Sequence, residues 1–207
     1  MNKPANFSNI HKYYDLINTI TTLGFDKSWR EKAVSNLIGK SVLDLGSGTG
    51  AAYEQLLNFE TTAIDPDKKM LELNAFDNKI LGSAENLPFE DNSFDNVFCS
   101  FVWRNVSDTN KALEEVHRVL KPGGKFILLD MTRPKNSFLK ILHKIGTFKV
   151  LHLIGLLTFN LKEYRFLYKS LDFYPQPEEH LNKDNFIDFK IERMGLFNFV
   201  YLAVFTK

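Results

Sequence analysis

Short apolar segments alternate with longer amphipathic ones between residues 41 and 131. The apolar runs predict five strands, at 41–45, 61–65, 80–81, 94–100 and 125–130. The segments between them predict helices over 51–59, 66–75 and 108–120. Pro66 is suited to the first turn of the second helix, and Asp108 is suited to cap the third. Because strands that alternate with helices form right-handed βαβ units, we expect an α/β, Rossmann-like fold with helices on both faces of a mostly parallel sheet.

The pattern differs on either side of this region. Residues 8–38 have apolar positions at helical spacing, and residues 136–171 are mostly helical in pattern. Two further apolar runs, at 186–191 and 197–205, predict strands close enough in sequence to form an antiparallel hairpin. Added to the five parallel strands, this C-terminal hairpin would complete a seven-stranded sheet.

One domain of residues 1–207 is predicted, with an N-terminal helical cap at 8–38 and a helical insertion at 131–175, because no repeat or flexible linker interrupts the chain. The 26 Lys and Arg residues nearly balance 25 Asp and Glu residues, so no basic field recruits nucleic acid. The lone Cys99 excludes an intrachain disulfide and a cysteine-rich zinc site, and no metal is predicted. Without a signal-peptide pattern or a spanning apolar run, we expect a cytoplasmic protein.

The ligand of a parallel α/β sheet binds beyond the carboxyl ends of its strands. Four predicted strands end there in Gly46, Asp65, Ser100 and Asp130. The first of these ends runs into a loop with three glycines at alternate positions, Asp44-Leu-Gly-Ser-Gly-Thr-Gly50. Such a loop lets the backbone approach a ligand closely and presents N–H groups to it.

Three interpretations of this loop are open. Gly46-x-Gly48-x-x-Ala51 fits a relaxed dinucleotide fingerprint, with Asp65 placed to bind a ribose, so NAD is one candidate ligand. A tight turn without any ligand is another. The third is a cationic ligand, which suits Asp44 better than a pyrophosphate does, because this carboxylate stands two residues before the first glycine.

The acid followed by x-G-x-G-x-G, together with the terminal hairpin, resembles class I S-adenosylmethionine (SAM) methyltransferases. The resemblance implies SAM as methyl donor and S-adenosylhomocysteine as product. It implies that Asp65 accepts hydrogen bonds from the ribose hydroxyls and that Ser83 and Ala84 flank the adenine. The remaining residues that we expect at the cofactor are Asp44, Gly46, Ser47, Gly48, Thr49, Pro66 and Ser100.

Three further motifs resemble the ubiquinone/menaquinone biosynthesis C-methyltransferases of the UbiE type: Leu87-Pro-Phe-Glu-Asp-Asn-Ser-Phe-Asp95, Arg104-Asn-Val-Ser-Asp108 and Arg118-Val-Leu-Lys-Pro-Gly-Gly124. This resemblance implies methyl transfer to a ring carbon of a lipophilic, polyprenylated quinol. The chain departs from the pattern at Ala51, which replaces an acid, and at Val102-Trp103, which replaces Gly-Leu. Another small molecule or lipid as acceptor, and a weakly catalytic SAM-fold subunit, are the alternatives.

On the acceptor side, Arg104 is the first candidate to stabilise a ring oxyanion, with Asn105 orienting it. A structural ion pair is the alternative role of Arg104. Tyr14, Tyr164 and Tyr168 are candidates to close over the site, with core packing as their alternative role. Amino-methylation of a nucleobase usually needs an Asn/Asp-Pro-Pro-aromatic turn after the fourth strand, and residues 99–103 contain no proline.

Residues 131–162 combine six Lys and Arg residues with many large apolar side chains and contain no acid. A basic, apolar helical segment of this kind can lie at a membrane surface, so peripheral membrane contact is one prediction. The alternatives are a homodimer contact and a lid that packs over the acceptor site, the role that we give the 131–175 insertion. The 19 Phe residues of the chain fit a lipophilic substrate but equally fit a biased coding composition.

Overall fold

The computed structural model describes residues 19, 22, 24–157, 161–181 and 185–207. The first part of the predicted cap at 8–38, including Tyr14, lies outside these residues. The strands are β1 (Ser41–Leu45), β2 (Glu60–Asp65), β3 (Lys79–Leu81), β4 (Phe94–Ser100), β5 (Leu120–Met131), β6 (Asp188–Met194) and β7 (Val200–Thr206). The helices are α2 (Asp26–Val34), α3 (Tyr53–Leu56), α4 (Lys68–Leu73), α5 (Thr109–Val119), α6 (Ser137–Leu157), α7 (Leu161–Phe173) and α8 (Pro177–His180). Two short 3₁₀ turns are η3 (Trp103–Asn105) and η4 (Leu196–Asn198).

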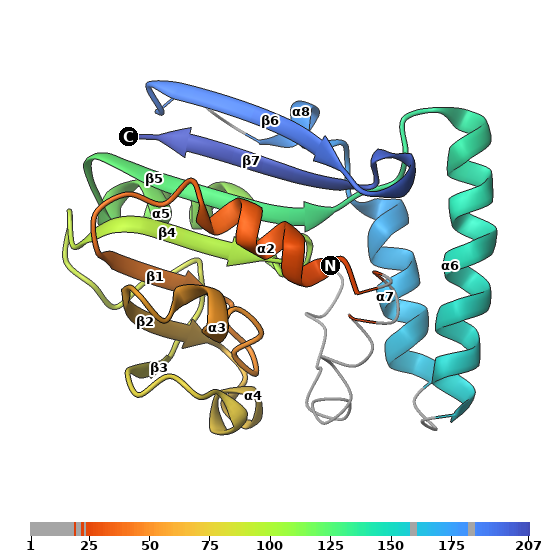
Figure 1. The fold of residues 1–207 in the computed structure, drawn as a ribbon, viewed down its shortest axis with the longest axis horizontal. Coiled ribbons are helices and arrows are strands. Elements are labelled where there is room, and N and C mark those ends of the chain that lie inside the picture. Colours follow the sequence, from red (N-terminus) through yellow and green to blue (C-terminus); the bar gives the residue numbers. More distant parts are fainter. Residues whose placement is uncertain (1–18, 20–21, 23, 158–160, 182–184) are drawn as a thin grey trace.

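The strands form one seven-stranded sheet in the order β3-β2-β1-β4-β5-β7-β6 (Figure 1). The pairs among β1 to β5 are parallel, whereas β7 is antiparallel to both β5 and β6. This confirms the predicted mostly parallel sheet with a C-terminal antiparallel hairpin. The strands β1 and β4 have the predicted bounds, because both are short apolar runs that are buried in the middle of the sheet.

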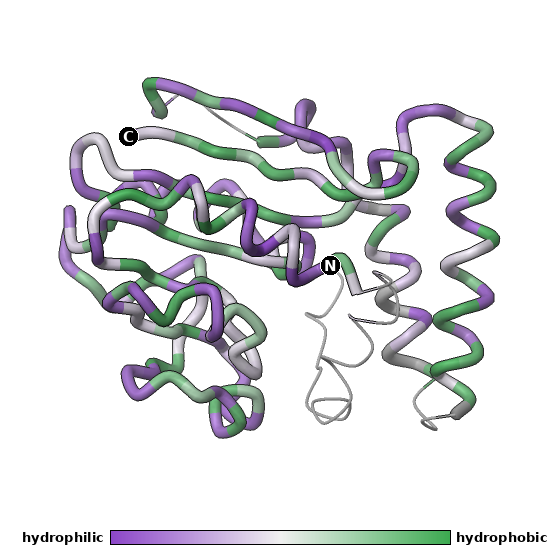
Figure 2. The backbone as a smooth tube through the Cα atoms, in the orientation of Figure 1, coloured by the Kyte–Doolittle hydropathy of each residue, from purple (hydrophilic) through white to green (hydrophobic). Residues whose placement is uncertain are grey.

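The sheet separates two hydrophobic clusters, since successive side chains of a strand point to opposite faces. Val97 and Cys99 of β4 belong to one cluster, together with the apolar face of α5. Phe98 between them belongs to the other cluster, with Trp29 and Ala33 of α2. Helices therefore cover both faces, as predicted, and Figure 2 shows the apolar central strands between them.

Three predicted boundaries are wrong for local reasons. The helix after β2 does not begin at Pro66, because Asp67 caps it by accepting bonds from the N–H groups of Lys69 (2.9 Å) and Met70 (3.4 Å), so α4 begins at Lys68. Strand β5 already begins at Leu120, which pairs with Phe94, and the predicted turn at 121–124 is an irregularity within the strand. The predicted strand 197–205 begins only at Val200, because positive φ angles at 195, 197 and 198 form a turn.

The long insertion consists of α6 and α7, which pack against each other at the end of the sheet where the parallel strands terminate (Figure 1). Arg133, which follows β5 and is buried, attaches this helical pair to the domain. Its guanidinium donates to the carboxylate of Asp172 on α7 (2.8 Å), to the hydroxyl of Thr147 on α6 (2.8 Å) and to the carbonyl of Tyr168 on α7 (3.2 Å). One buried side chain thus holds both helices.

Candidate active site

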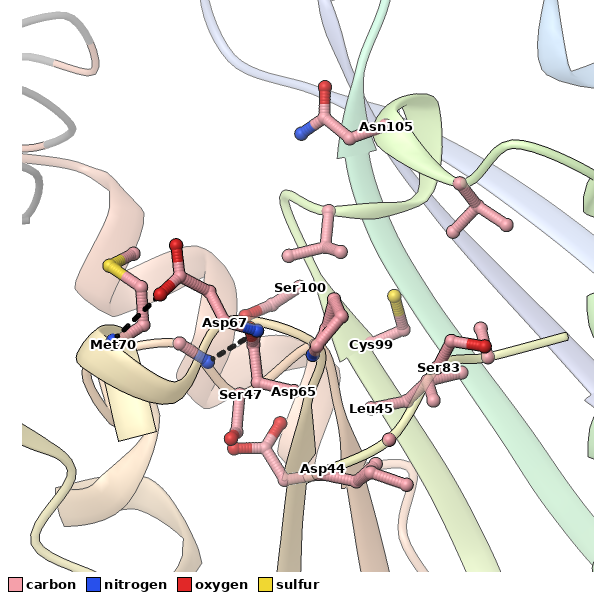
Figure 3. A pocket seen from close by; sticks show the side chains of 18 of the residues that line it. Asp44, Leu45, Ser47, Asp65, Asp67, Met70, Ser83, Cys99, Ser100 and Asn105 are labelled. Atoms are coloured by element: carbon pink, nitrogen blue, oxygen red, sulfur yellow. Dashed lines mark hydrogen bonds between the residues drawn. The ribbon is translucent and has the colours of Figure 1, made fainter. Parts of the chain in front are cut away.

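A cavity of about 250 Å³ lies at the carboxyl ends of β1, β2 and β4 (Figure 3). All ten residues that the sequence assigned to the cofactor line it: Asp44, Gly46, Ser47, Gly48, Thr49, Asp65, Pro66, Ser83, Ala84 and Ser100. Segments that are far apart in the sequence therefore meet at one place, as expected for ligand sites of parallel sheets. Their individual roles toward a ligand stay predictions.

The glycine loop after β1 forms one wall of the cavity. Gly46 has a φ of +70°, and a Cβ atom at this position would lie 2.4 Å from a methyl carbon of Val102. Only glycine fits there, because both the backbone conformation and the close approach of Val102 exclude a side chain. The N–H groups of Gly46 and Ser47 donate to the carbonyl of Ile64 (2.8 and 3.0 Å), which ties the loop to the end of β2.

Asp65, the last residue of β2, fixes the same loop through its side chain. One carboxylate oxygen accepts a bond from the N–H of Gly48 (2.9 Å) and the other from the N–H of Asp67 (2.8 Å). Burial nevertheless raises the pKa of Asp65 to about 6, although both backbone N–H groups act in the opposite direction. A carboxylate has about four acceptor positions, so Asp65 can still accept bonds from two ligand hydroxyls.

Asp44 is buried on β1, and its carboxylate lies beside Ser47 and Asp65 in the cavity wall (Figure 3). Its Oδ2 atom accepts no hydrogen bond from any residue that the structure describes. The pKa of Asp44 is raised to about 7, mainly by burial; the nearby Arg30 acts to lower it and the Asp65 carboxylate acts to raise it. An orphaned buried carboxylate oxygen of this kind is stabilised by a ligand that brings positive charge and N–H donors.

The opposite end of the cavity has a second orphaned acceptor. Asn105, in the η3 turn, lines the cavity, and its carboxamide oxygen is buried without a partner among the described residues. SAM carries an ammonium, a sulfonium, two ribose hydroxyls and an adenine amino group. The residues present fit this donor set, because the cavity combines a close-approach glycine loop with the acceptors Asp44 and Asp65.

Arg104 was predicted to face the methyl acceptor, but its side chain lies elsewhere in the structure. Its side chain does not line the cavity described above; it is buried and forms an ion pair with Asp130 at the end of β5. Its guanidinium also donates to the carbonyl of Phe101 (3.1 Å), and its backbone N–H donates to the Asp130 carboxylate (3.0 Å). The structure thus favours the structural alternative, in which Arg104 and Asp130 hold the turn that carries Val102 and Asn105. A direct contact with an acceptor stays a prediction.

Of the three candidate tyrosines, Tyr164 and Tyr168 are within the described residues, and neither lines the cavity. Tyr164 is buried between α6 and α7, and Tyr168 packs edge-on against Phe148 with ring centroids 5.6 Å apart. They contribute to the packing of the helical pair, which favours the core-packing alternative for both side chains. The lid role of the 131–175 insertion itself stays a prediction.

Sequence reasoning missed a buried cation in the cavity wall. Arg30 on α2 is buried, pairs with Asp26 (2.6 Å between Nη1 and Oδ2) and lies over the ring of Phe101 at 5.1 Å. Met70 and Glu85 are further lining residues that no motif indicated. An Asp and an Arg four residues apart look like an ordinary surface pair on a helix, so the sequence alone carried no signal that Arg30 reaches the site.

The raised pKa of Asp44 predicts a pH dependence of SAM binding. The ionised carboxylate binds a cation and the protonated form does not, so SAM affinity should fall as the pH decreases through 7, by up to about tenfold per pH unit. Calorimetric titrations between pH 5.5 and 7.5 measure this. In Asp44→Asn, binding should be weaker at every pH, and the remaining pH dependence should move toward 6, where Asp65 titrates. A wild-type profile without any change over this interval contradicts the role of Asp44.

Solved structures share the fold. A SAM-dependent methyltransferase of Thermotoga maritima, named a possible histamine N-methyltransferase, matches over 97% of both chains with a TM-score of 0.70 and 23% sequence identity. A SAM-dependent methyltransferase of Aquifex aeolicus covers 96% of this chain and 97% of its own, with a TM-score of 0.56 and 17% identity. At these identities the likeness concerns the fold alone. The fold is that of class I SAM-dependent methyltransferases, and the cavity lies at the strand ends where its residues fit SAM.

The sequence comparisons identify the family within this class. Residues 4–188 match the model of the ubiE/COQ5 methyltransferase family. The ubiquinone/menaquinone biosynthesis C-methyltransferase UbiE of Rickettsia bellii is 37% identical over 194 residues, which cover 84% of this chain and 78% of the relative. The protein of the same name from Rickettsia akari is 35% identical over the same shares of both chains. The chain belongs to the ubiE/COQ5 methyltransferase family, and SAM is its methyl donor.

Proposed function

We propose that this enzyme methylates a ring carbon of a quinol with a lipophilic tail, in the biosynthesis of ubiquinone or menaquinone. The observation that carries the proposal is the similarity to UbiE proteins over most of the chain, at 35–37% identity. The cavity supports the proposal. Asp44 and Asp65, at the ends of β1 and β2, fit SAM, and residues in and around the η3 turn line another part of the cavity, where the methyl acceptor would bind. Val102 and Val106, the residues on either side of that turn, contribute apolar side chains to the cavity wall.

The chemistry requires an electrophilic methyl group, which SAM supplies when it is bound, and an electron-rich ring carbon beside a hydroxyl. The overall reaction forms a carbon–carbon bond, leaves a neutral thioether and releases one proton from the ring. Because a positive donor and an anionic ring lose their charges together, a cavity that excludes water favours the reaction over bulk solvent. The chain provides this exclusion through Val102, Val106 and the closely approaching Gly46.

The η3 turn would position the acceptor. Asn105 of this turn lines the cavity, and its carboxamide oxygen is buried without a partner among the described residues. Its oxygen can accept a hydrogen bond from a ring hydroxyl and so orient the ring toward the methyl group. The ion pair of Arg104 with Asp130 keeps this turn in place.

The oxidation state of the acceptor tests the proposal. A quinol ring is electron-rich and can attack a methyl group through carbon, whereas the oxidised quinone ring is electron-poor. With a short-tailed quinol that has an open ring position, ¹³C-methyl SAM should give a product with the label on a ring carbon by NMR. The quinone form, kept oxidised in a parallel reaction, should give none. Equal transfer to both forms, or a label on oxygen only, would overturn the proposal.

A further inference from the structure

The outer face of α6 is apolar, although it points away from the rest of the molecule. Phe138, Ile141, Ile145, Leu153 and Leu156 are exposed by 68, 57, 50, 58 and 50%, respectively. The side of α6 that is buried, with Leu151 and Gly155, packs against α7. A helix at a protein surface normally presents polar residues outward, and one that is apolar all round is covered by another molecule or phase.

The spacing of these residues places them on one face of the helix. They follow one another at intervals of three or four residues, except between Ile145 and Leu153, and residues at such spacing lie on one face of a helix. The position between these two, four residues from each, is occupied by the exposed Lys149, so the apolar stripe includes one cation. The helix has 21 residues and is therefore about 31 Å long. Figure 1 shows α6 at the edge of the molecule, with α7 between it and the sheet. No helix within the described ranges is sufficiently long and apolar to cross a membrane.

The charge around this stripe is strongly positive. The α6–α7 region from residue 137 to 173 has six Lys and Arg residues and two acids, a net charge of +4. The whole chain carries +1, which leaves −3 for all remaining residues. Lys144 pairs with Asp172 (3.2 Å), but Lys140 and Lys149 on α6 form no ion pair with any residue in the described part of the chain.

We infer that the apolar stripe and the exposed lysines of α6 dock this helix onto the surface of an anionic phospholipid bilayer. A second copy of the chain is a poorer occupant, because a symmetric dimer through this face would bring two regions of charge +4 together. An anionic lipid surface instead attracts each lysine and accepts the apolar side chains between its headgroups. The parallel strands end on the side of the molecule where α6 and α7 lie (Figure 1). Docking through α6 therefore brings the side with the cavity toward the membrane.

Vesicle binding tests this inference without any assumption about the methyl acceptor. The full chain should sediment with vesicles of 70% phosphatidylcholine and 30% phosphatidylglycerol, and only weakly with pure phosphatidylcholine. Raising the salt concentration to 0.5 M should weaken the binding, because salt screens the attraction of the lysines. Each cation near an anionic surface contributes about fivefold in affinity, so Lys140→Glu with Lys149→Glu should reduce binding by about 30-fold or more.

The matched control is Lys111→Glu with Lys190→Glu, which makes the same charge change at exposed positions on α5 and β6. It should bind the anionic vesicles within about threefold of the wild type. Phe138→Ser with Leu153→Ser should weaken binding even though the charge is unchanged. Equal binding of the charge-reversed variant and the wild type, or no vesicle binding by the wild type, overturns the inference.

Sedimentation equilibrium tests whether a second copy of the chain, rather than a membrane, covers the apolar stripe. A wild-type dimer that dissociates on Phe138→Ser with Leu153→Ser shows that a second copy covers the stripe, and this result also overturns the inference. Methylation of a short-tailed quinol in the absence of vesicles should be the same in the Lys140→Glu, Lys149→Glu variant and the wild type. Vesicle binding therefore tests membrane docking, and methylation without vesicles tests the proposed function, so that one can fail without the other.

Discussion

Replacement of Asp65 by alanine is expected to weaken SAM binding by about a hundredfold or more. The buried carboxylate holds the glycine loop through Gly48, and the remaining acceptor positions are those that we assign to the ribose hydroxyls. A hydrogen bond to a charged group contributes about 1.5–3 kcal/mol, so the loss of two such bonds corresponds to this factor. Calorimetric titration with SAM at pH 8, where Asp65 is ionised in the wild type, measures the effect.

Two controls belong to this experiment. Asp91→Ala removes an exposed carboxylate that pairs with Arg118, and SAM affinity should not change. Asp65→Asn keeps one oxygen acceptor and should retain part of the affinity that the alanine variant loses. If Asp65→Ala is folded, as judged by circular dichroism, and still binds SAM within threefold of the wild type, then Asp65 does not bind the donor.

Replacement of Arg104 by alanine should lower the free energy of unfolding by about 3–5 kcal/mol, the cost of leaving one member of a buried ion pair alone. The side chains of Arg104 and Asp130 are exposed by only 6 and 0%, so water cannot take the place of the guanidinium. Urea unfolding at pH 7 measures the change. Arg104→Met combined with Asp130→Asn removes both charges and should recover much of the stability.

The double variant Arg104→Met, Asp130→Asn also distinguishes a structural role of Arg104 from a direct contact with the methyl acceptor. If Arg104 only holds the η3 turn, turnover should recover in the double variant together with stability, because Val102 and Asn105 return to their positions. If it also contacts the acceptor, as the sequence predicts, turnover should stay roughly 100-fold low while SAM affinity is normal. A stability of Arg104→Ala within 1 kcal/mol of the wild type would show that the ion pair does not hold the turn.

The fold could be predicted from the sequence because its signals are local. Each central strand is a short apolar run, β1 runs into Gly46 and β2 ends in Asp65, and the segment Asp44–Gly50 places an identifiable loop at a strand end. The positions of Gly46, Asp65 and Ser100 at the ends of parallel strands were sufficient to predict that they meet. All ten predicted cofactor residues consequently line one cavity.

What could not be predicted depends on packing between distant segments. Asp130 was expected at a strand end, yet nothing local indicated that its carboxylate binds the guanidinium and backbone of Arg104, 26 residues earlier. Arg30 reaches the cavity only because α2 packs over the sheet, and no motif around Arg30 expresses that contact. At Pro66 two local signals competed, and because the side chain of Asp67 caps the helix, α4 begins two residues later than proline predicts.

The central claim is that this enzyme transfers a methyl group from SAM to the ring carbon of a lipophilic quinol. The most direct test offers the purified enzyme SAM with a deuterated methyl group and a reduced lipid extract from bacterial membranes, and identifies every labelled product by mass and fragmentation. The account predicts a label in the ring of a polyprenylated quinol and its absence with Asp65→Ala. Label in a lipid headgroup or a small acid or amine, with none in a quinol, would contradict it.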